Sequence, residues 1–326
     1  MRAIVQTKEG IALKDLAKPA VAPGFLLVKV KANAINRADV MMMHGAVHGG
    51  GGWGEGAETP FGLEWAGEVV EVGEGAKLYK VGDRIMGSGA GAFAEYKLAH
   101  PFGVYPIPDS MSYEQATCLP VALQTMHDAV VINGKLAKGQ TIFFQGGGSA
   151  VGMIGMQIAR YRGAGKIIAS TNKAEQLAKL KEIGADVTIN TGDRDWVEQV
   201  LKATDGAGVD VLIDFVAGPT VVDSLRCMKV AGRMINIGRM AGESGEFNFD
   251  LHNMNRIQYI GCSFRARNIF ESMEVVLKTA MSLSSALKKG AFKMPIDKVF
   301  LFEKFMDALV RMDKNQHFGK IVLVQE

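Results

Sequence analysis

The stretch that decides the fold runs from Thr141 to Gly152 and reads TIFFQGGGSAVG. Its first four residues predict a short buried strand, and a helix-like apolar pattern begins at Met153, after three consecutive glycines. A glycine turn between a strand and a helix lets backbone N–H groups approach a pyrophosphate. The helix N-terminus adds about half a positive charge there. The stretch therefore predicts a dinucleotide-binding unit.

The loop departs in one place from the G-x-G-x-x-G fingerprint of such units. When the pattern is started at Gly147, Ser149 stands where the second glycine is expected. Ser149 can still offer a backbone N–H, and its hydroxyl can bond a phosphate oxygen. We expect the following loop residues to bind the cofactor: Gly147, Gly148, Ser149, Ala150, Val151 and Gly152.

Strands and helices alternate after this loop. Apolar strand-like runs are expected at 166–170, 187–189, 209–215 and 233–237, and amphipathic helices at 153–162, 174–183, 196–203 and 220–228. Strands that recur with one helix between them imply βαβ crossovers. The sequence therefore predicts an α/β fold in which residues 121–261 form a doubly wound parallel sheet, the Rossmann arrangement.

The rest of the chain is predicted to form a second, mostly β domain. Short alternating runs such as LLVKVKA (26–32) are separated by Gly, Pro and Asp turns, as is typical of half-buried strands. Helices are expected near 269–289 and 303–312, and the chain closes on the strand-like run GKIVLV. We expect this last strand to return to the β domain, which is then discontinuous, 1–120 and 262–326.

The end of the second Rossmann strand predicts which nicotinamide cofactor binds. Sites for NAD place an acid there for the ribose 2′-hydroxyl. Here the strand ends in ASTNK, with no acid until Glu175. Ser170, Thr171 and Lys173 suit a 2′-phosphate, which favours NADPH. Lys173 can instead be an exposed lysine at a helix start, and Arg194 is a weaker candidate.

Composition excludes several classes of partner. The net charge of +3 over 326 residues argues against nucleic acid or a membrane surface, and no apolar run reaches about 18 residues. Cys118, Cys227 and Cys262 are too far apart for a zinc ribbon, so we expect buried thiols in a reducing compartment. The opening MRAIVQTKEG is no signal peptide. We expect a cytoplasmic protein that acts on a small-molecule substrate.

Several segments together resemble the medium-chain dehydrogenase/reductase superfamily, and within it the zinc-independent quinone oxidoreductases. The segments are KANAINRAD (31–39), GLEWAGEVVEVG (62–73), VGDRI (81–85), AFAEY (92–96), KEIGAD (181–186) and GKIV (319–322), besides the glycine loop. The resemblance covers nearly the whole chain. It implies a GroES-like catalytic domain beside the Rossmann domain, and a homodimer for which strand 258–264 is a candidate pairing edge.

The resemblance also raises the question of a metal. Zinc-dependent members bind a catalytic zinc through a Cys and a His, which fall here at Asn36 and Leu63. Neither a leucine nor an amide oxygen is a competent zinc ligand. Residues 86–105 also lack the cysteines of the structural zinc lobe. We therefore expect no metal, and we interpret His44 and His48 as parts of an exposed loop.

Without a metal, the resemblance implies hydride transfer from NADPH to a quinone or an α,β-unsaturated carbonyl. A reductase of small aldehydes or ketones, or a non-catalytic NADPH-binding structural or redox-sensing protein, are the alternatives. The implied catalytic residue is Asn36, near the nicotinamide ribose, although Asn36 can also cap the helix that starts at Arg37. Met41 and Leu63 are expected to form an apolar pocket wall, with Glu64 as support beneath it.

The resemblance suggests further cofactor residues and leaves two questions open. A family threonine near the nicotinamide aligns with either Thr125 or His127. Gly238 and Arg239 follow the fifth major strand, at the carboxyl end of the sheet, where such folds bind ligands. Phe264 and Arg265 begin the run FRAR (264–267), which is expected to edge the active cleft, where Arg265 and Arg267 can meet cofactor phosphate or an anionic substrate. A solvated or interface patch is the alternative. The proton donor stays open between Arg37, His44 and solvent.

Overall fold

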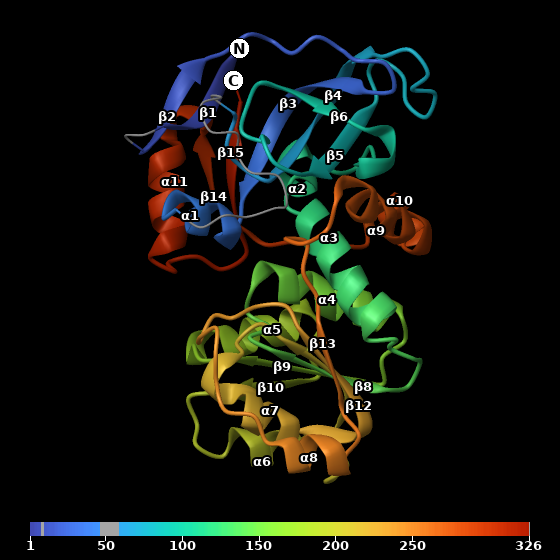
Figure 1. The fold of residues 1–326 in the computed structure, drawn as a ribbon, viewed down its shortest axis with the longest axis vertical. Coiled ribbons are helices and arrows are strands. Elements are labelled where there is room, and N and C mark those ends of the chain that lie inside the picture. The colour runs from blue at the N-terminus through green and yellow to red at the C-terminus, as the bar shows by residue number, and fades with distance from the viewer. Residues whose placement is uncertain (8–9, 46–58, 326) are drawn as a thin grey trace. The chain divides into compact units, whose positions relative to one another are not determined.

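The computed structural model describes residues 1–7, 10–45 and 59–325. The chain divides into two compact units (Figure 1). The first unit comprises Met1–Gln124 and Phe264–Glu326, and the second comprises Thr125–Ser263. The chain passes from the first to the second within α3 (Pro120–Met126), which continues as a π-helical stretch, His127–Asn133.

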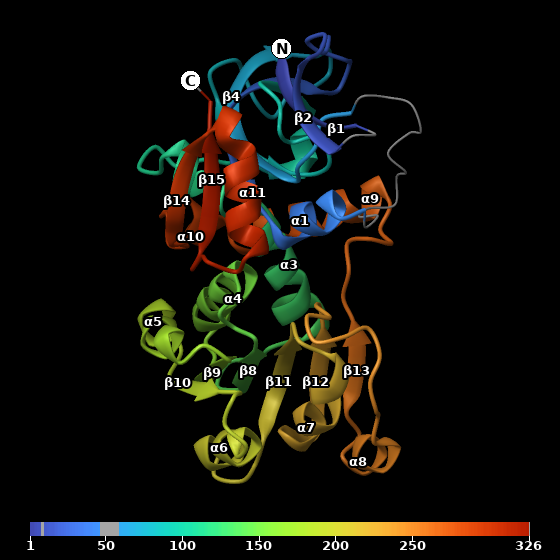
Figure 2. The ribbon, with the colours of Figure 1, turned by 90° about the vertical axis from the view of Figure 1, so that its left-hand side faces the viewer.

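The second unit is a six-stranded sheet in which every neighbouring pair is parallel, in the order β10-β9-β8-β11-β12-β13. Figure 2 shows β8, β11, β12 and β13 side by side. The strands are β8 (Thr141–Gln145), β9 (Lys166–Thr171), β10 (Val187–Asn190), β11 (Val209–Asp214), β12 (Met228–Asn236) and β13 (Gln258–Gly261). The predicted doubly wound parallel sheet is confirmed.

Helices cover both faces of this sheet. α4 (Ala150–Tyr161) and α5 (Leu177–Ile183) lie on one side, and α6 (Trp196–Ala203), α7 (Val221–Arg226) and α8 (Phe249–Met254) lie on the other (Figure 1). Phe143, Leu212 and Met234, from three neighbouring strands, share one buried cluster with residues of α6 and α7. Strands buried on both faces read as continuous apolar runs, which explains TIFF and VLI in the sequence.

The first unit is built on a mostly antiparallel sheet in the order β14-β15-β3-β4-β5-β7, to which β6 pairs through β3. Its strands are β3 (Leu26–Ile35), β4 (Glu64–Val72), β5 (Arg84–Ser88), β6 (Tyr96–Ala99), β7 (Val104–Pro106), β14 (Ile296–Leu301) and β15 (Lys320–Val324), with β1 (Arg2–Thr7) and β2 (Gly10–Asp15) as a separate hairpin. The terminal strand returns as predicted, because β15 pairs antiparallel with β3.

The helices of the first unit are α1 (Arg37–Met43), α2 (Tyr113–Ala116), α9 (Ile269–Ser282), α10 (Ser284–Lys288) and α11 (Phe305–Asp313). One helix was expected at 269–289, but Leu283 interrupts it with φ −106° and ψ 8°, between serines that favour the helix weakly. No helix in the described part of the chain combines the length and apolar composition that a membrane span requires.

The strand expected at 258–264 is shorter than predicted. β13 ends at Gly261, because Gly261 pairs with Asn236, the last residue of its partner β12. The chain then turns at Phe264, whose carbonyl accepts a bond from the N–H of Arg267. β13 is nevertheless an edge strand of its sheet. All three cysteines are buried, as expected.

Candidate active site

The glycine loop joins the carboxyl end of β8 to α4. Ser149 is the N-cap of α4, and its hydroxyl oxygen accepts a bond from the N–H of Gly152 at 3.1 Å. The N–H groups of Gly147 and Ser149 bond the carbonyls of Phe144 and Gly146. The loop therefore holds its own shape through internal hydrogen bonds.

The loop residues divide into two groups by their surroundings. Gly147 and Gly152 are buried, and a Cβ on Gly152 would lie 2.8 Å from the carbonyl oxygen of Gly147, so these two glycines allow close packing. Gly148, Ala150 and Val151 are partly exposed, and among the described residues no acceptor is found for their N–H groups. Because first-turn N–H groups have no partner within the helix, these three donors fit a pyrophosphate.

The hydroxyl groups at the end of β9 form hydrogen bonds within the protein. Ser170 is fully buried, and its hydroxyl oxygen accepts the N–H of Gly146 at 3.1 Å. The Thr171 hydroxyl donates to Gln176 at 3.1 Å and accepts the N–H of Lys173 at 3.2 Å. Ser170 thus supports the loop through the oxygen of its hydroxyl, and its predicted contact with the 2′-phosphate stays a prediction. Lys173 is half-buried and begins the short 3-10 helix that follows β9.

Gly238 and Arg239 follow β12 at the same end of the sheet. A Cβ on Gly238 would lie 2.3 Å from the carbonyl oxygen of Phe215, so only glycine lets the two chain segments approach this closely. Arg239 is exposed. Gly238 therefore shapes the sheet end, and Arg239 is the side chain there that can reach a ligand.

Asp214, which the sequence did not single out, ends β11 beside these residues. It is fully buried, and its Oδ1 accepts the N–H groups of Val216 and Ala217 at 2.8 and 3.0 Å. Its Oδ2 has no partner within the described residues, and burial raises the pKa of the carboxyl group. Ala217 has φ +54°, so this carboxylate holds a strained turn.

Thr125 and His127 differ in accessibility. Thr125 is half-buried, whereas His127 is only 2% exposed. Neither nitrogen of His127 has a hydrogen-bond partner within the described residues, and burial, with Arg162 nearby, lowers its pKa to about 4. His127 is therefore neutral at physiological pH, and Thr125 is the better placed to meet a ligand.

The first unit contains a buried network around Asn36. Lys320 Nζ donates to Asn36 Oδ1 and to Glu64 Oε2, both at 2.6 Å, and Asn36 Nδ2 donates to the same Glu64 oxygen at 3.0 Å. The other Glu64 oxygen accepts the N–H of Val121 at 2.7 Å. Glu64 and Lys320 are at most 1% exposed. Glu64 is thus the predicted support, and Lys320 is its unforeseen partner.

Asn36 is the N-cap residue of α1, and its N–H is bound by Asp39, three residues further along the chain. Asp39 Oδ2 accepts the N–H of Asn36 at 2.7 Å, at the start of α1, while the Asn36 side chain bonds Lys320 and Glu64. Asp39 is fully buried, and its Oδ1 has no partner within the described residues. Burial raises its pKa to about 7, although the Asn36 N–H and the Lys320 charge oppose the rise.

The residues at the family's zinc positions do not fit a zinc ion. Asn36 Oδ1 already accepts a bond from an ammonium group, which would repel a dication. Leu63 is half-buried against the apolar core, and Met41 is 37% exposed at the surface of α1. His44 pairs with Asp313 at 3.4 Å. His48 lies outside the described residues. No group of three His, Cys, Asp or Glu side chains suited to a metal is found in the described ranges.

Phe264 and Arg265 lie in the turn after β13. Both are half-buried, and the Arg267 guanidinium lies over the Phe264 ring, 5.2 Å from its centre. This stacking orders the turn that presents Arg265. Their predicted contact with phosphate stays a prediction.

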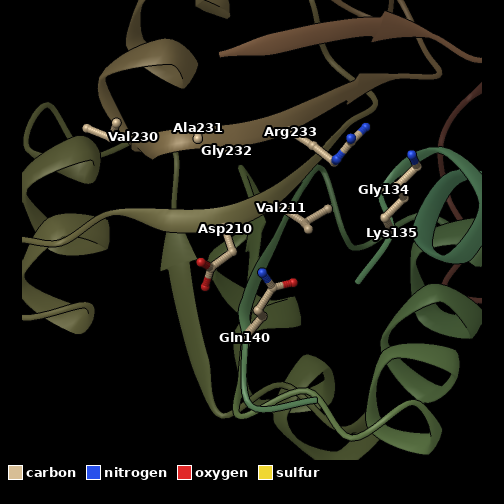
Figure 3. A pocket seen from close by; sticks show the side chains of 9 residues that line it. All are labelled: Gly134, Lys135, Gln140, Asp210, Val211, Val230, Ala231, Gly232 and Arg233. Atoms are coloured by element: carbon tan, nitrogen blue, oxygen red, sulfur yellow. The ribbon is translucent and has the colours of Figure 1, made fainter. Parts of the chain in front are cut away.

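A small polar pocket of the second unit lies at the amino ends of β8 and β11, away from the glycine loop. Lys135, Gln140, Asp210 and Arg233 contribute to its lining (Figure 3). The Asp210 carboxylate pairs with Lys229 at 3.1 Å and also accepts a backbone N–H at 2.9 Å. These contacts link neighbouring chain segments, so we assign the pocket's acid to structure and not to cofactor binding.

Two family models match the chain. A model described as "Alcohol dehydrogenase GroES-like domain" matches residues 22–109, and one described as "Zinc-binding dehydrogenase" matches residues 150–279. The first match lies in the unit that contains Asn36, Glu64 and Lys320. The second covers α4, β9 and the rest of the parallel sheet.

Similar proteins span the whole chain. Quinone oxidoreductase-like protein 2 of Mus musculus is 26% identical over 321 residues, which are 98% of this chain and 90% of the mouse protein. The crystal structure of an alcohol dehydrogenase superfamily protein from Novosphingobium aromaticivorans has a TM-score of 0.88 at 23% identity, covering 100% of both chains. The native structure of a mycobacterial quinone oxidoreductase has a TM-score of 0.83 at 26% identity, covering 99% of both chains.

Proposed function

Because the chain belongs to the medium-chain dehydrogenase/reductase superfamily and has quinone oxidoreductase-like relatives, we propose that this oxidoreductase is an NADPH-dependent, zinc-independent reductase of quinones or α,β-unsaturated carbonyls. Dehydrogenases of this superfamily use nicotinamide cofactors, which supply a hydride when bound. A reductase of small aldehydes or ketones, and a non-catalytic NADPH-binding protein, are the alternatives.

The observation that carries the proposal is the Lys320–Asn36–Glu64 network. The resemblance sets one zinc ligand at Asn36, and here the amide oxygen of Asn36 accepts a bond from the Lys320 ammonium group. Without a Lewis acid to polarise a carbonyl, simple alcohol oxidation loses its usual assistance. Quinones and activated alkenes remain suitable acceptors because conjugation spreads the charge that a hydride delivers.

Two groups of residues support NADPH as the cofactor. The N–H groups of Gly148, Ala150 and Val151 offer a donor set for a pyrophosphate at the start of α4. Residues 170–174, at the end of β9, include no acid for a 2′-hydroxyl, and Lys173 offers a positive charge near that position. Lys173 is therefore our candidate for the 2′-phosphate.

In the proposed mechanism the protein contributes mainly positioning. In the second unit, the glycine loop would hold the pyrophosphate. In the first unit, Asn36 would hold a polar group of the cofactor or acceptor, and Leu63 with Met41 would give the acceptor an apolar wall. NADPH, when bound, would supply the hydride that, with one proton, converts a quinone into a quinol. Of the proton sources considered, His44 is paired with Asp313, so we propose that solvent supplies the proton.

An assay of NADPH oxidation at 340 nm tests the proposal. We expect turnover with 1,4-quinones and enones, and at least about tenfold lower kcat/KM with unconjugated aldehydes and ketones. Faster turnover of the unconjugated carbonyls would favour the alternative enzyme. NADPH binding without turnover of any acceptor would favour the non-catalytic alternative.

The cofactor assignment has its own test. We expect Lys173→Ala to lower the preference for NADPH over NADH by about tenfold, which is the effect of about 1.4 kcal/mol of lost phosphate interaction. Lys202→Ala is the matched control, since Lys202 is an exposed cation of α6 in the same unit. An unchanged NADPH/NADH ratio in Lys173→Ala would remove Lys173 from the phosphate site.

We also propose a homodimer that pairs through β13, which is an edge strand with an open row of backbone groups. Light scattering after size exclusion measures its mass. Tyr259→Pro, which removes a backbone donor from the strand, is expected to give a monomer.

A further inference from the structure

We propose that Lys320 is a positioning residue that locks the side-chain amide of Asn36 in one orientation, so that Asn36 offers a bound ligand a hydrogen-bond acceptor and no donor. The inference rests on the proposed function for the ligand, which is NADPH. It deepens that function by assigning the polarity of the group that Asn36 can recognise.

The orientation follows from the chemistry of the two neighbours. A lysine ammonium is only a donor, and an ionised carboxylate is only an acceptor. Lys320 Nζ lies 2.6 Å from one amide atom of Asn36, and Glu64 Oε2 lies 3.0 Å from the other. The first amide atom must therefore be oxygen and the second nitrogen. A flipped amide would set donor against donor and acceptor against acceptor.

The remaining bonding capacity of Asn36 can then be counted. Its Nδ2 has two hydrogens, and these go to Glu64 at 3.0 Å and to the carbonyl of Ala34 at 3.3 Å. Its Oδ1 has two lone pairs, and Lys320 occupies one of them. One acceptor position is left. Asn36 retains 8% exposure, whereas the side chains of Lys320 and Glu64 are 2% and 0% exposed.

The register of the sheet holds this arrangement in place. Ile35 of β3 is paired with Ile321 of β15, so Asn36 and Lys320 are the next residues along the two antiparallel strands. The backbone N–H of Lys320 donates to the carbonyl of Pro295 at 2.8 Å. The amide, ammonium and carboxylate are thus held together by backbone pairing as well as by their own contacts.

The ligand group at Asn36 must consequently be a donor. A ribose hydroxyl or the carboxamide N–H of the nicotinamide half of NADPH meets this condition. A carbonyl oxygen or the anion that develops on a reduced quinone does not, because it needs a donor. Asn36 therefore orients the cofactor, and the charge on the acceptor must be stabilised by other groups.

The test uses the double variant Glu64→Gln with Lys320→Gln. It leaves no buried charge unpaired, and each new amide can both donate and accept, so Asn36 is free to flip. Lys320→Arg keeps a donor-only cation and should therefore keep the Asn36 amide in its parental orientation. Asn36→Ala removes the acceptor. The matched control is Lys18→Gln with Glu71→Gln, an exposed pair of the same unit at 3.2 Å.

Fluorescence titration with NADPH and steady-state kinetics give the first readout. We expect the double variant and Asn36→Ala to weaken NADPH binding by about threefold to tenfold. The loss should be larger in the affinity for NADPH than in kcat at saturating NADPH. Lys320→Arg and the control should bind NADPH as the parent does. A fall in kcat of about 100-fold with unchanged NADPH affinity would mean that Asn36 donates to the reacting oxygen, and would overturn the proposal.

Exchange of the Asn36 side-chain amide hydrogens, followed by NMR with ¹⁵N-labelled asparagine, tests the lock even if the protein does not bind NADPH. Both hydrogens should be protected in the parent and in Lys320→Arg, and at least about tenfold less protected in the double variant. Equal protection in the parent and the double variant would show that Lys320 and Glu64 do not hold the amide. Failure of NADPH binding alone would instead count against the proposed function.

Discussion

The Asp39→Asn variant is expected to become more stable relative to its parent as the pH rises, because the first unit of the parent loses stability when Asp39 ionises. Asp39 is fully buried, and burial raises the pKa of its carboxyl group from 3.8 to about 7. A raised pKa means that the folded state prefers the protonated acid. The cost of ionising Asp39 is absent below pH 3.8, grows between the two pKa values, and is complete above about pH 7. Asparagine has no such cost.

The magnitude follows from the size of the shift. A change from 3.8 to about 7, at about 1.4 kcal/mol for each pH unit, corresponds to about 4 kcal/mol in full. About 2.5 kcal/mol of this is expected between pH 5 and pH 8. Asparagine can still accept the Asn36 N–H that now bonds Asp39 Oδ2 at 2.7 Å. Other effects of the substitution are independent of pH, so the slope is the quantity to compare.

Urea denaturation at pH 5, 6, 7 and 8 measures this slope. A two-unit chain need not unfold in one step, so we choose a Trp196→Phe background, in which the remaining tryptophans belong to the first unit. The difference in free energy of unfolding between Asp39→Asn and its parent should grow by about 2.5 kcal/mol from pH 5 to pH 8. Asp109→Asn, at an exposed aspartate of the same unit, should give a constant difference. Parallel pH curves for Asp39→Asn and its parent would refute the reasoning.

Three further substitutions test the packing and the network. Gly238→Ala should lower the free energy of unfolding of the second unit by about 1–3 kcal/mol in urea denaturation, because its Cβ would lie 2.3 Å from a backbone carbonyl oxygen. Gly261→Ala is the control and should cost less than about 1 kcal/mol, because a Cβ there has nothing within 4 Å. Glu64→Gln should lower stability by about 3–5 kcal/mol, because it leaves the Lys320 ammonium buried without its anion, and adding Lys320→Gln should recover at least half of that loss. His127→Phe should raise stability at pH 7 by about 1 kcal/mol, because both imidazole nitrogens are buried without a partner among the described residues. A loss of stability would contradict this reasoning.

The fold could be predicted from the sequence because its signals are local. The alternation of apolar runs and amphipathic helices after Thr141 is readable within windows of about ten residues, and it implies a parallel sheet. The strand expected at 258–264 ends early, at Gly261, because Gly261 pairs with Asn236, the last residue of its partner β12, and this register is not readable from residue type.

The strand, glycine loop and helix from Thr141 to Tyr161 were predictable for the same reason, but the contacts of each loop residue were not. Ser149 and Ser170 have the same hydroxyl, and both were assigned to phosphates. In the structure the Ser149 hydroxyl caps α4 and the Ser170 hydroxyl accepts the N–H of Gly146. Which way a hydroxyl faces depends on the tertiary neighbours. The donors that do suit a pyrophosphate are backbone groups, which no side-chain pattern encodes directly.

The network at Asn36 was beyond prediction because its members come from three distant segments. Lys320 and Asn36 are 284 positions apart, and their contact depends on the register of β15 against β3. The signal that was present is a lysine that opens the buried run IVL, since a charged group beside a buried run needs a partner. That partner is Glu64 of β4, whose carboxylate accepts a bond from the Lys320 ammonium group.

Stability alone does not explain why this region contains two carboxylates and an ammonium group that are almost completely buried. Replacing a buried ion pair by apolar residues of similar volume is often neutral or stabilising. What apolar residues cannot do is choose between the two orientations of an amide. Lys320 and Glu64 fix the orientation of the Asn36 amide, because Lys320 donates to its oxygen and Glu64 accepts from its nitrogen. Positioning of the Asn36 amide, as we propose, is therefore a better account of the buried charges than stability.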